Sequence, residues 1–187
     1  YDLAFAAPAQ SMLREYTAMP WSHYIINPQT HLRERFDVRI SNLDRSAYNY
    51  TYRYVIADEE DRILRTYSGG SWVIQPFSQY GYQDYQPHAN PIVLPNPLPN
   101  APAPERTFRI IHSIKEGATG DNFRRNDTIV FEQKFASHFA YDDGSAENIH
   151  IVKGRDPGVA MRFRANHPDT LKSVQVVLME ALNANEE

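Results

Sequence analysis

The pattern of apolar and polar positions along the chain is that of short β-strands. Residues 36–40 alternate apolar and charged side chains, and tyrosines occupy every second position from Tyr48 to Tyr54. A period of two places each apolar set on one face of a strand. The pattern resumes at 107–112 and 128–135. The alternation therefore predicts an antiparallel sheet built from these segments.

Polar, turn-forming stretches separate the predicted strands. Residues 41–46 and 58–61 are connections of this kind, and Ser-Gly-Gly-Ser at 68–71 predicts a turn between strands at 62–67 and 72–74. Short strands with closely spaced turns are typical of a β-sandwich rather than of a β/α fold. We therefore expect an all-β chain.

Prolines divide the chain into regions. Seven of them fall within 87–104, so this stretch cannot supply a central strand and is predicted to be a long surface loop. The loop lies inside a predicted sandwich at 30–139, because strand patterns continue on both sides of it. Residues 1–29 are predicted to hold a first strand at 2–5 and an irregular arm, since Pro20 stops any helix early.

A second unit follows at 140–187. A turn signal at 141–145 leads into predicted strands at 149–152, 159–163 and 174–178. A unit of this size seldom folds alone. We expect its apolar strand face to be covered by residues beyond 187, by the first domain or by another chain, which implies missing C-terminal strands or a protein partner.

Composition excludes several classes of protein. The 187 residues carry a formal net charge of −4, without the basic excess that nucleic-acid binding needs. The absence of cysteine excludes disulfides, Cys-ligated zinc and thiol catalysis. No apolar run is long enough for a membrane helix. The chain starts at Tyr1 without a signal-peptide pattern, so we expect a processed or excised piece of a longer protein.

Four motifs carry a resemblance to a known family. They are NDTIVFEQKF at 126–135, AYDDGSAE at 140–147, VAMRF at 159–163 and PDTLKSVQV at 168–176. Together they resemble a junction in secreted and surface proteins of bacteria with a type IX secretion system. The resemblance implies an Ig-like β-sandwich followed by the first strands of a jelly-roll-like β-sandwich. The chain departs from the family at 148–151, where a Tyr/Phe-Gly pair is common and this chain has NIHI.

The resemblance implies a non-catalytic structural or adhesive region of an extracellular or cell-surface, outer-membrane-associated bacterial protein, within a surface or secretion-associated assembly. Two alternatives remain open: an accessory region of a secreted hydrolase, with its catalytic domain outside this chain, and a carbohydrate-binding module. No Gly-x-Ser-x-Gly elbow, P-loop or Gly-x-Gly-x-x-Gly motif occurs. We therefore expect no enzyme within these residues.

Asp142, Asp143 and Glu147 form an acidic turn around Gly144. Carboxylate oxygens on a tight turn are calcium ligands, so calcium is the one candidate cofactor. The alternative is a plain β-turn with solvated acids. Seven histidines never occur at His-x-His or His-x-x-x-His spacing, so no catalytic metal site is predicted.

Aromatic residues at 72–85 give a candidate binding surface. Tyr80, Tyr82 and Tyr85 lie in a Gln-, Gly- and Pro-bearing loop, where they either contact a carbohydrate or protein partner or pack internally. Trp72 and Phe77 are predicted to pack in the core.

Two threonines match an O-glycan acceptor pattern that the resemblance implies, Asp-Thr followed by an apolar residue. They are Thr128 and Thr170. The alternative for each is an ordinary strand residue.

Overall fold

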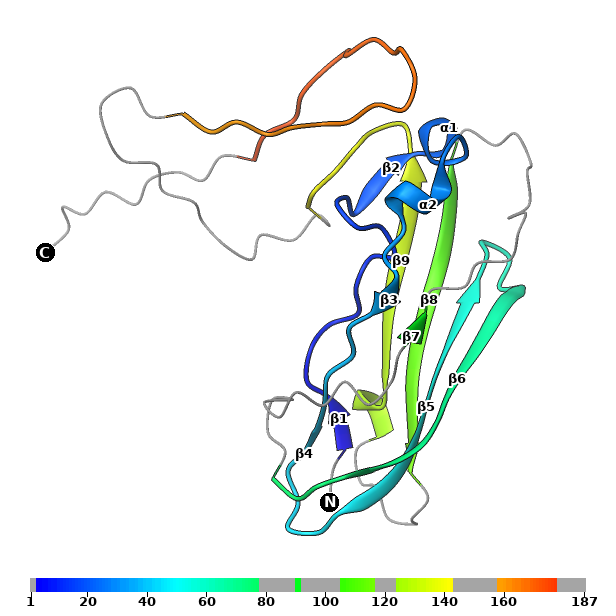
Figure 1. The fold of residues 1–187 in the computed structure, drawn as a ribbon, viewed down its shortest axis with the longest axis vertical. Helices are drawn as coiled ribbons and strands as arrows, with labels where there is room; N and C mark the ends of the chain where they lie inside the picture. The colour runs from blue at the N-terminus through cyan, green and yellow to red at the C-terminus, as the bar shows by residue number, and fades with distance from the viewer. Residues whose placement is uncertain (1–2, 78–89, 92–104, 117–123, 143–157, 178–187) are drawn as a thin grey trace, which may run out of the picture.

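The computed structural model describes residues 3–77, 90–91, 105–116, 124–142 and 158–177. The described chain is all-β, with three sheets and only short helices. Figure 1 shows a tall main sheet with the smaller sheets on one side of it. The extended residues at 158–177 lie at the upper end, near α1 and β2.

The main sheet has five strands in the order β2-β9-β8-β5-β6. Their bounds are β2 Ala18–Pro20, β9 Thr128–Ala136, β8 Arg106–Glu116, β5 Tyr48–Ala57 and β6 Ile63–Ile74. All neighbours are antiparallel except β2 and β9, which run parallel. The predicted strands at 48–56, 107–112 and 128–135 are therefore confirmed.

The tyrosine alternation builds the buried face of this sheet. Tyr50, Tyr52 and Tyr54 on β5 are almost fully buried, whereas the residues between them are exposed. On β8, Ile114 lies opposite Tyr52 and His112 lies opposite Tyr54. Residues directly opposite each other share a face, so the two strands bury one continuous surface.

Two small sheets lie beside the main one. β1 (Leu3–Phe5) pairs antiparallel with β4 (Ile40–Asn42), and β3 (Arg35–Phe36) pairs with β7 (Asn90–Pro91). The single strand predicted at 36–40 is therefore wrong, because its two ends pair with different strands. The apolar residues of this stretch are nevertheless buried in the core.

The N-terminal arm, residues 10–32, covers one end of the main sheet. The arm contains β2 and two one-turn helices, α1 (Trp21–Tyr24) and α2 (Pro28–His31). Outside the arm, a 3₁₀ turn at Arg124–Asn126 precedes β9. The Trp21 ring lies 5.1 Å from the Phe135 ring of β9. The arm is thus irregular only in part, because packing on the sheet stabilises helices too short to form alone.

A buried amide on β9 fixes the arm to the sheet. The Gln133 Oε1 accepts hydrogen bonds from Ser11 Oγ (2.6 Å) and the Met12 N–H (3.0 Å). Its Nε2 donates to the Thr17 carbonyl at 2.8 Å. Since Gln133 is fully buried, these bonds satisfy an amide that would otherwise destabilise the core.

The turn predicted at 68–71 is wrong. These residues lie within β6, and the pairing with β5 shifts register beside them, between Thr51 and Arg53. Gly70 has φ of +81°, a conformation that favours glycine and allows a strand irregularity in place of a turn.

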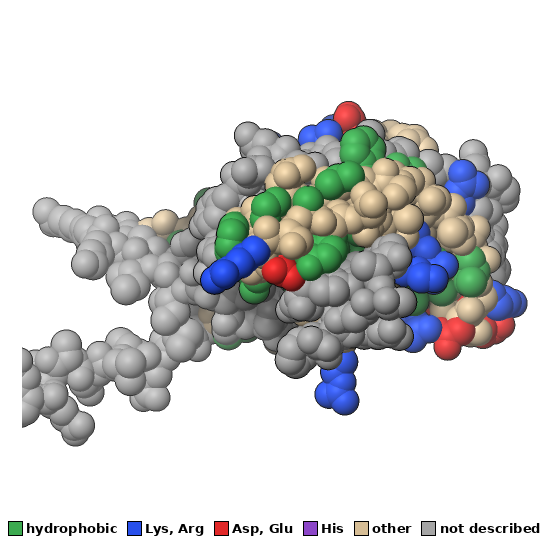
Figure 2. All heavy atoms as spheres, turned by 90° about the horizontal axis from the view of Figure 1, so that it is seen from below, with side chains coloured by type: hydrophobic (Ala, Val, Ile, Leu, Met, Phe, Trp, Pro, Cys, Tyr) green, Lys and Arg blue, Asp and Glu red, His purple; other side chains and the backbone are tan. Residues whose placement is uncertain are grey.

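The core positions predicted for Trp72 and Phe77 are also wrong, because these side chains are 40% and 57% exposed. The reason for Trp72 is that β6 is the edge strand of the described sheet and has a neighbour on one side only. Figure 2, which views the molecule of Figure 1 from below, shows hydrophobic side chains at the surface of its lower end.

Residues 158–177, here called the extended segment, form no strand ladder with the described residues. The strands predicted at 159–163 and at 174–177 are therefore wrong. Residue 178, the last of the second predicted strand, and the strand predicted at 149–152 lie outside the described residues. Its large apolar side chains stay exposed: Val159, Met161, Phe163, Leu171, Val174, Val176 and Val177.

Candidate interaction site

The extended segment contacts the arm and the residues that follow β9 through an aromatic cluster. The rings of Phe139 and Tyr141 each lie 5.1 Å from the Tyr16 ring. The Phe163 ring lies 5.3 Å from Tyr141 and is parallel to Tyr16 at 6.4 Å. Aromatic pairs at these separations are stabilising beyond their buried area. The cluster therefore holds Phe163 although its other face remains exposed.

Tyrosine hydroxyls extend this contact to the backbone of the segment. The Arg164 N–H donates to Tyr16 Oη at 2.8 Å, and Tyr141 Oη donates to the Arg162 carbonyl. Burial raises the pKa of Tyr16, so its hydroxyl stays neutral at ordinary pH. Two backbone groups of the segment, which forms no strand ladder, are thus hydrogen-bonded to the arm and to the residues that follow β9.

Asn166 binds both short helices of the arm. Its backbone N–H donates to His23 Nδ1 at 3.0 Å. Its side-chain Nδ2 donates to the His23 carbonyl at 2.6 Å and contacts His31 Nε2 at 2.5 Å. His23 lies in α1 and His31 in α2, and both are buried. The one-turn helices thus place two imidazoles around one asparagine.

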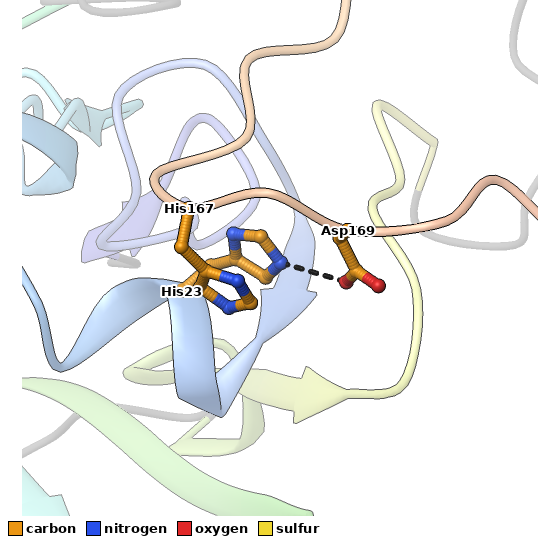
Figure 3. A group of neighbouring side chains, drawn as sticks. All are labelled: His23, His167 and Asp169. Carbon is orange, nitrogen blue, oxygen red and sulfur yellow. Dashed lines mark hydrogen bonds and ion pairs between the residues drawn. The ribbon is translucent and has the colours of Figure 1, made fainter.

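His23 also contacts two residues beyond Asn166, as Figure 3 shows. Its Nε2 lies 3.0 Å from Asp169 Oδ2, and its ring stacks on the His167 ring at 3.8 Å with an angle of 11° between the planes. The hydrogen bond from His23 lowers the pKa of the exposed Asp169 carboxyl. Asp169 is therefore ionised at all but strongly acidic pH.

His23, His167 and Asp169 offer atoms of the kinds that bind zinc, all within 4.8 Å of one another. The geometry nevertheless favours a hydrogen-bonded cluster. A zinc-binding histidine donates its second ring N–H outward, whereas the second nitrogen of His23 accepts the Asn166 N–H. The two rings are also nearly parallel, so their lone pairs do not converge on one point.

The acidic turn is described only at its start. The Asp142 side chain is exposed, and the backbone carbonyl of Asp142 accepts a hydrogen bond from Thr17 Oγ1 at 2.6 Å. Asp143 and Glu147 lie outside the described residues, so the calcium site stays a prediction.

The other predicted site residues are not brought together. Tyr80, Tyr82 and Tyr85 lie outside the described residues. Thr128 is exposed at the first position of β9, and Thr170 is exposed in the extended segment. Nothing in their surroundings distinguishes a glycan acceptor from an ordinary surface threonine, so both stay predictions.

Sequence reasoning missed the cluster around Asn166. No histidine pair has metal-ligand spacing, so the sequence does not single out His23 and His31. Asn166 lies 143 and 135 residues from them along the chain. The local signal is the pair His167 and Asp169, two residues apart, which alone does not identify a partner.

Comparison of the chain with protein-family models, curated proteins and solved structures found no match. Within the described part of the chain, every helix is too short or too polar to cross a membrane.

Proposed function

We propose that the chain is a non-catalytic structural or adhesive β-sandwich region of a secreted or cell-surface bacterial protein, and that its extended segment pairs with a strand of another chain. In this proposal 30–139 is an Ig-like module and 140–187 opens a jelly-roll-like unit of a type IX secretion-associated protein. The motifs at 126–135 and 140–147 support that assignment. The exposed apolar pattern of the extended segment supports the pairing.

The segment has the side-chain pattern of a strand that lacks its sheet. Val159, Met161 and Phe163 recur at spacing two and are 72%, 60% and 47% exposed. Val174 and Val176 repeat the pattern, each 67% exposed. The segment forms no strand ladder with the described residues, and an extended backbone without a ladder pairs readily with another strand. Burial of these side chains supplies the driving force for that pairing.

The segment is also held in place before it binds. Contacts of Arg164 and Asn166 with the arm, and of Arg162 with Tyr141, fix its middle. Restricting a binding segment in advance lowers the entropy lost on association. Arg162 and Arg164 alternate with Met161 and Phe163, so they lie on the opposite face of the extended backbone. The best-fitting partner strand therefore alternates apolar and acidic residues.

The surroundings of His23 and His112 favour a role without catalysis. Both nitrogens of His23 are engaged, one by Asn166 and the other by Asp169. Neither is left to accept a proton from a nucleophile. His112 is buried inside the core at 1% exposure, where a substrate has no access. These arrangements suit structural roles.

Sedimentation velocity of residues 1–187 over a range of concentrations tests the pairing, because a second copy is the available partner strand in a purified sample. We expect reversible self-association, and we expect Val176→Lys to weaken it at least about tenfold. Ser173→Lys is the matched control, since it adds the same charge on the opposite face. A chain that stays monomeric, with slow amide exchange through 171–177, would refute the proposal.

A further inference from the structure

The donors of Asn166 determine the protonation of the imidazoles that they contact. Nδ2 lies 2.6 Å from the His23 carbonyl oxygen, which only accepts hydrogen bonds. This contact assigns the amide nitrogen, and not the amide oxygen, to that position. The same NH₂ group lies 2.5 Å from His31 Nε2. His31 Nε2 must therefore carry a lone pair and no proton.

The same argument applies to His23. A backbone N–H can only donate, so His23 Nδ1 must accept the bond from Asn166. The proton of the neutral ring then sits on Nε2 and points to Asp169 Oδ2. Both imidazoles are therefore neutral while Asn166 is docked.

We propose that this contact is a pH-sensitive latch: Asn166 binds while His23 and His31 are neutral, and protonation of either ring releases the extended segment from the arm. A proton on His23 Nδ1 or His31 Nε2 places a donor against a donor and removes one hydrogen bond. The inference rests on the proposed function, because it concerns how the same segment is presented to its partner.

The charged and titratable groups around the two rings act in both directions. Asp169 and the stacked His167 face His23. Around His31, Glu15 favours the charged form, and Arg164 and His23 oppose it.

Burial is the largest influence on His31 and lowers its pKa. The latch is therefore fully stable above the ordinary histidine pKa of about 6.5, and its stability is lost as the pH falls from there through the lowered pKa. Asp169 does not cause this loss, because its pKa lies below that of an ordinary aspartate. An acid-driven release below the ordinary histidine pKa thus belongs to the histidines and not to Asp169.

Amide hydrogen exchange followed by NMR tests the latch in the whole chain. We expect protection of the Asn166 amide to fall at least about tenfold between about pH 7.5 and about pH 5, after correction for intrinsic rates. Amides of β8 serve as the reference, because this strand has a neighbour on each side and reports the global fold.

Variants separate the latch from general acid sensitivity. His31→Gln offers a side-chain oxygen that accepts from Asn166 and does not titrate, so it should reduce the acid-driven loss. His138→Gln, at an exposed position, is the matched control and should behave like the unmodified chain. Asn166→Ala keeps the backbone N–H but removes both side-chain contacts, so protection of the residue-166 amide should fall at both pH values.

The outcomes distinguish the latch from the function on which it rests. High protection of Asn166 at both pH values, with β8 intact, overturns the latch and leaves the docked segment. Low protection at both values overturns the docking itself and with it the proposed presentation of the segment. If His31→Gln does not fold, the pH profile of the unmodified chain still decides between these outcomes.

Discussion

Acid should destabilise this protein through His112, whose side chain sits inside the core. It is 1% exposed, its ring lies 4.8 Å from the Phe36 ring, and its Nδ1 lies 2.8 Å from Tyr52 Oη. Its Nε2 is buried without a hydrogen-bond partner in the described part of the chain. Burial lowers the pKa of His112 to about 4, because the charged ring loses its hydration there.

The size of the effect follows from the two pKa values. An unfolded histidine titrates near 6.5, so a folded value of about 4 corresponds to about 3 kcal/mol of unfolding free energy. Since the folded pKa is the lower one, this contribution is fully present above about pH 6.5. It is lost as the pH falls through about 4.

Urea unfolding at a series of pH values between about 7 and 4 measures this loss. His112→Gln keeps a hydrogen-bonding group for Tyr52 but does not titrate. We expect the unmodified chain to lose about 3 kcal/mol more than this variant across the range, whereas His138→Gln should follow the unmodified chain. Equal losses in His112→Gln and the unmodified chain would refute the reasoning.

Two further predictions concern the arm and the acidic turn. Gln133→Met removes the buried amide, so the Met12 N–H and the Thr17 carbonyl lose their hydrogen bonds to it. The unfolding free energy from urea titration should therefore drop by about 2 to 4 kcal/mol. An unchanged value would contradict the role of Gln133 as an anchor of the arm. If the acidic turn binds calcium, millimolar calcium should raise the Tm and Asp143→Asn should remove the rise, whereas an unchanged Tm would support the plain turn.

Three of the five strands of the main sheet were predictable from the sequence alone, whereas β2 lies in the predicted irregular arm and β6 continues through a predicted turn. The alternation from Tyr48 to Tyr54 and at 107–112 and 128–135 identified β5, β8 and β9, because side-chain alternation is a property of the extended backbone itself. The faces were predictable as well, since Tyr50, Tyr52 and Tyr54 were expected on one face and are buried together.

Positions with two locally acceptable conformations were decided by tertiary pairing. Residues 68–71 suit a turn or an irregular strand equally, and pairing with β5 selected the strand. Trp72 has a large apolar side chain of the kind found in cores, yet its place on an edge strand leaves it partly exposed. In both cases the neighbouring strand supplied information that local sequence does not contain.

The cluster around Asn166 was decided by the tertiary structure alone. His23, His31 and Asn166 carry no spacing signal, because they come from two helices and a segment far away in the sequence. Hydrogen-bond donors and acceptors specify a contact only once the backbone brings them within about 3 Å. The sequence determines which groups are available, and the packing of the arm on the main sheet determines which of them meet.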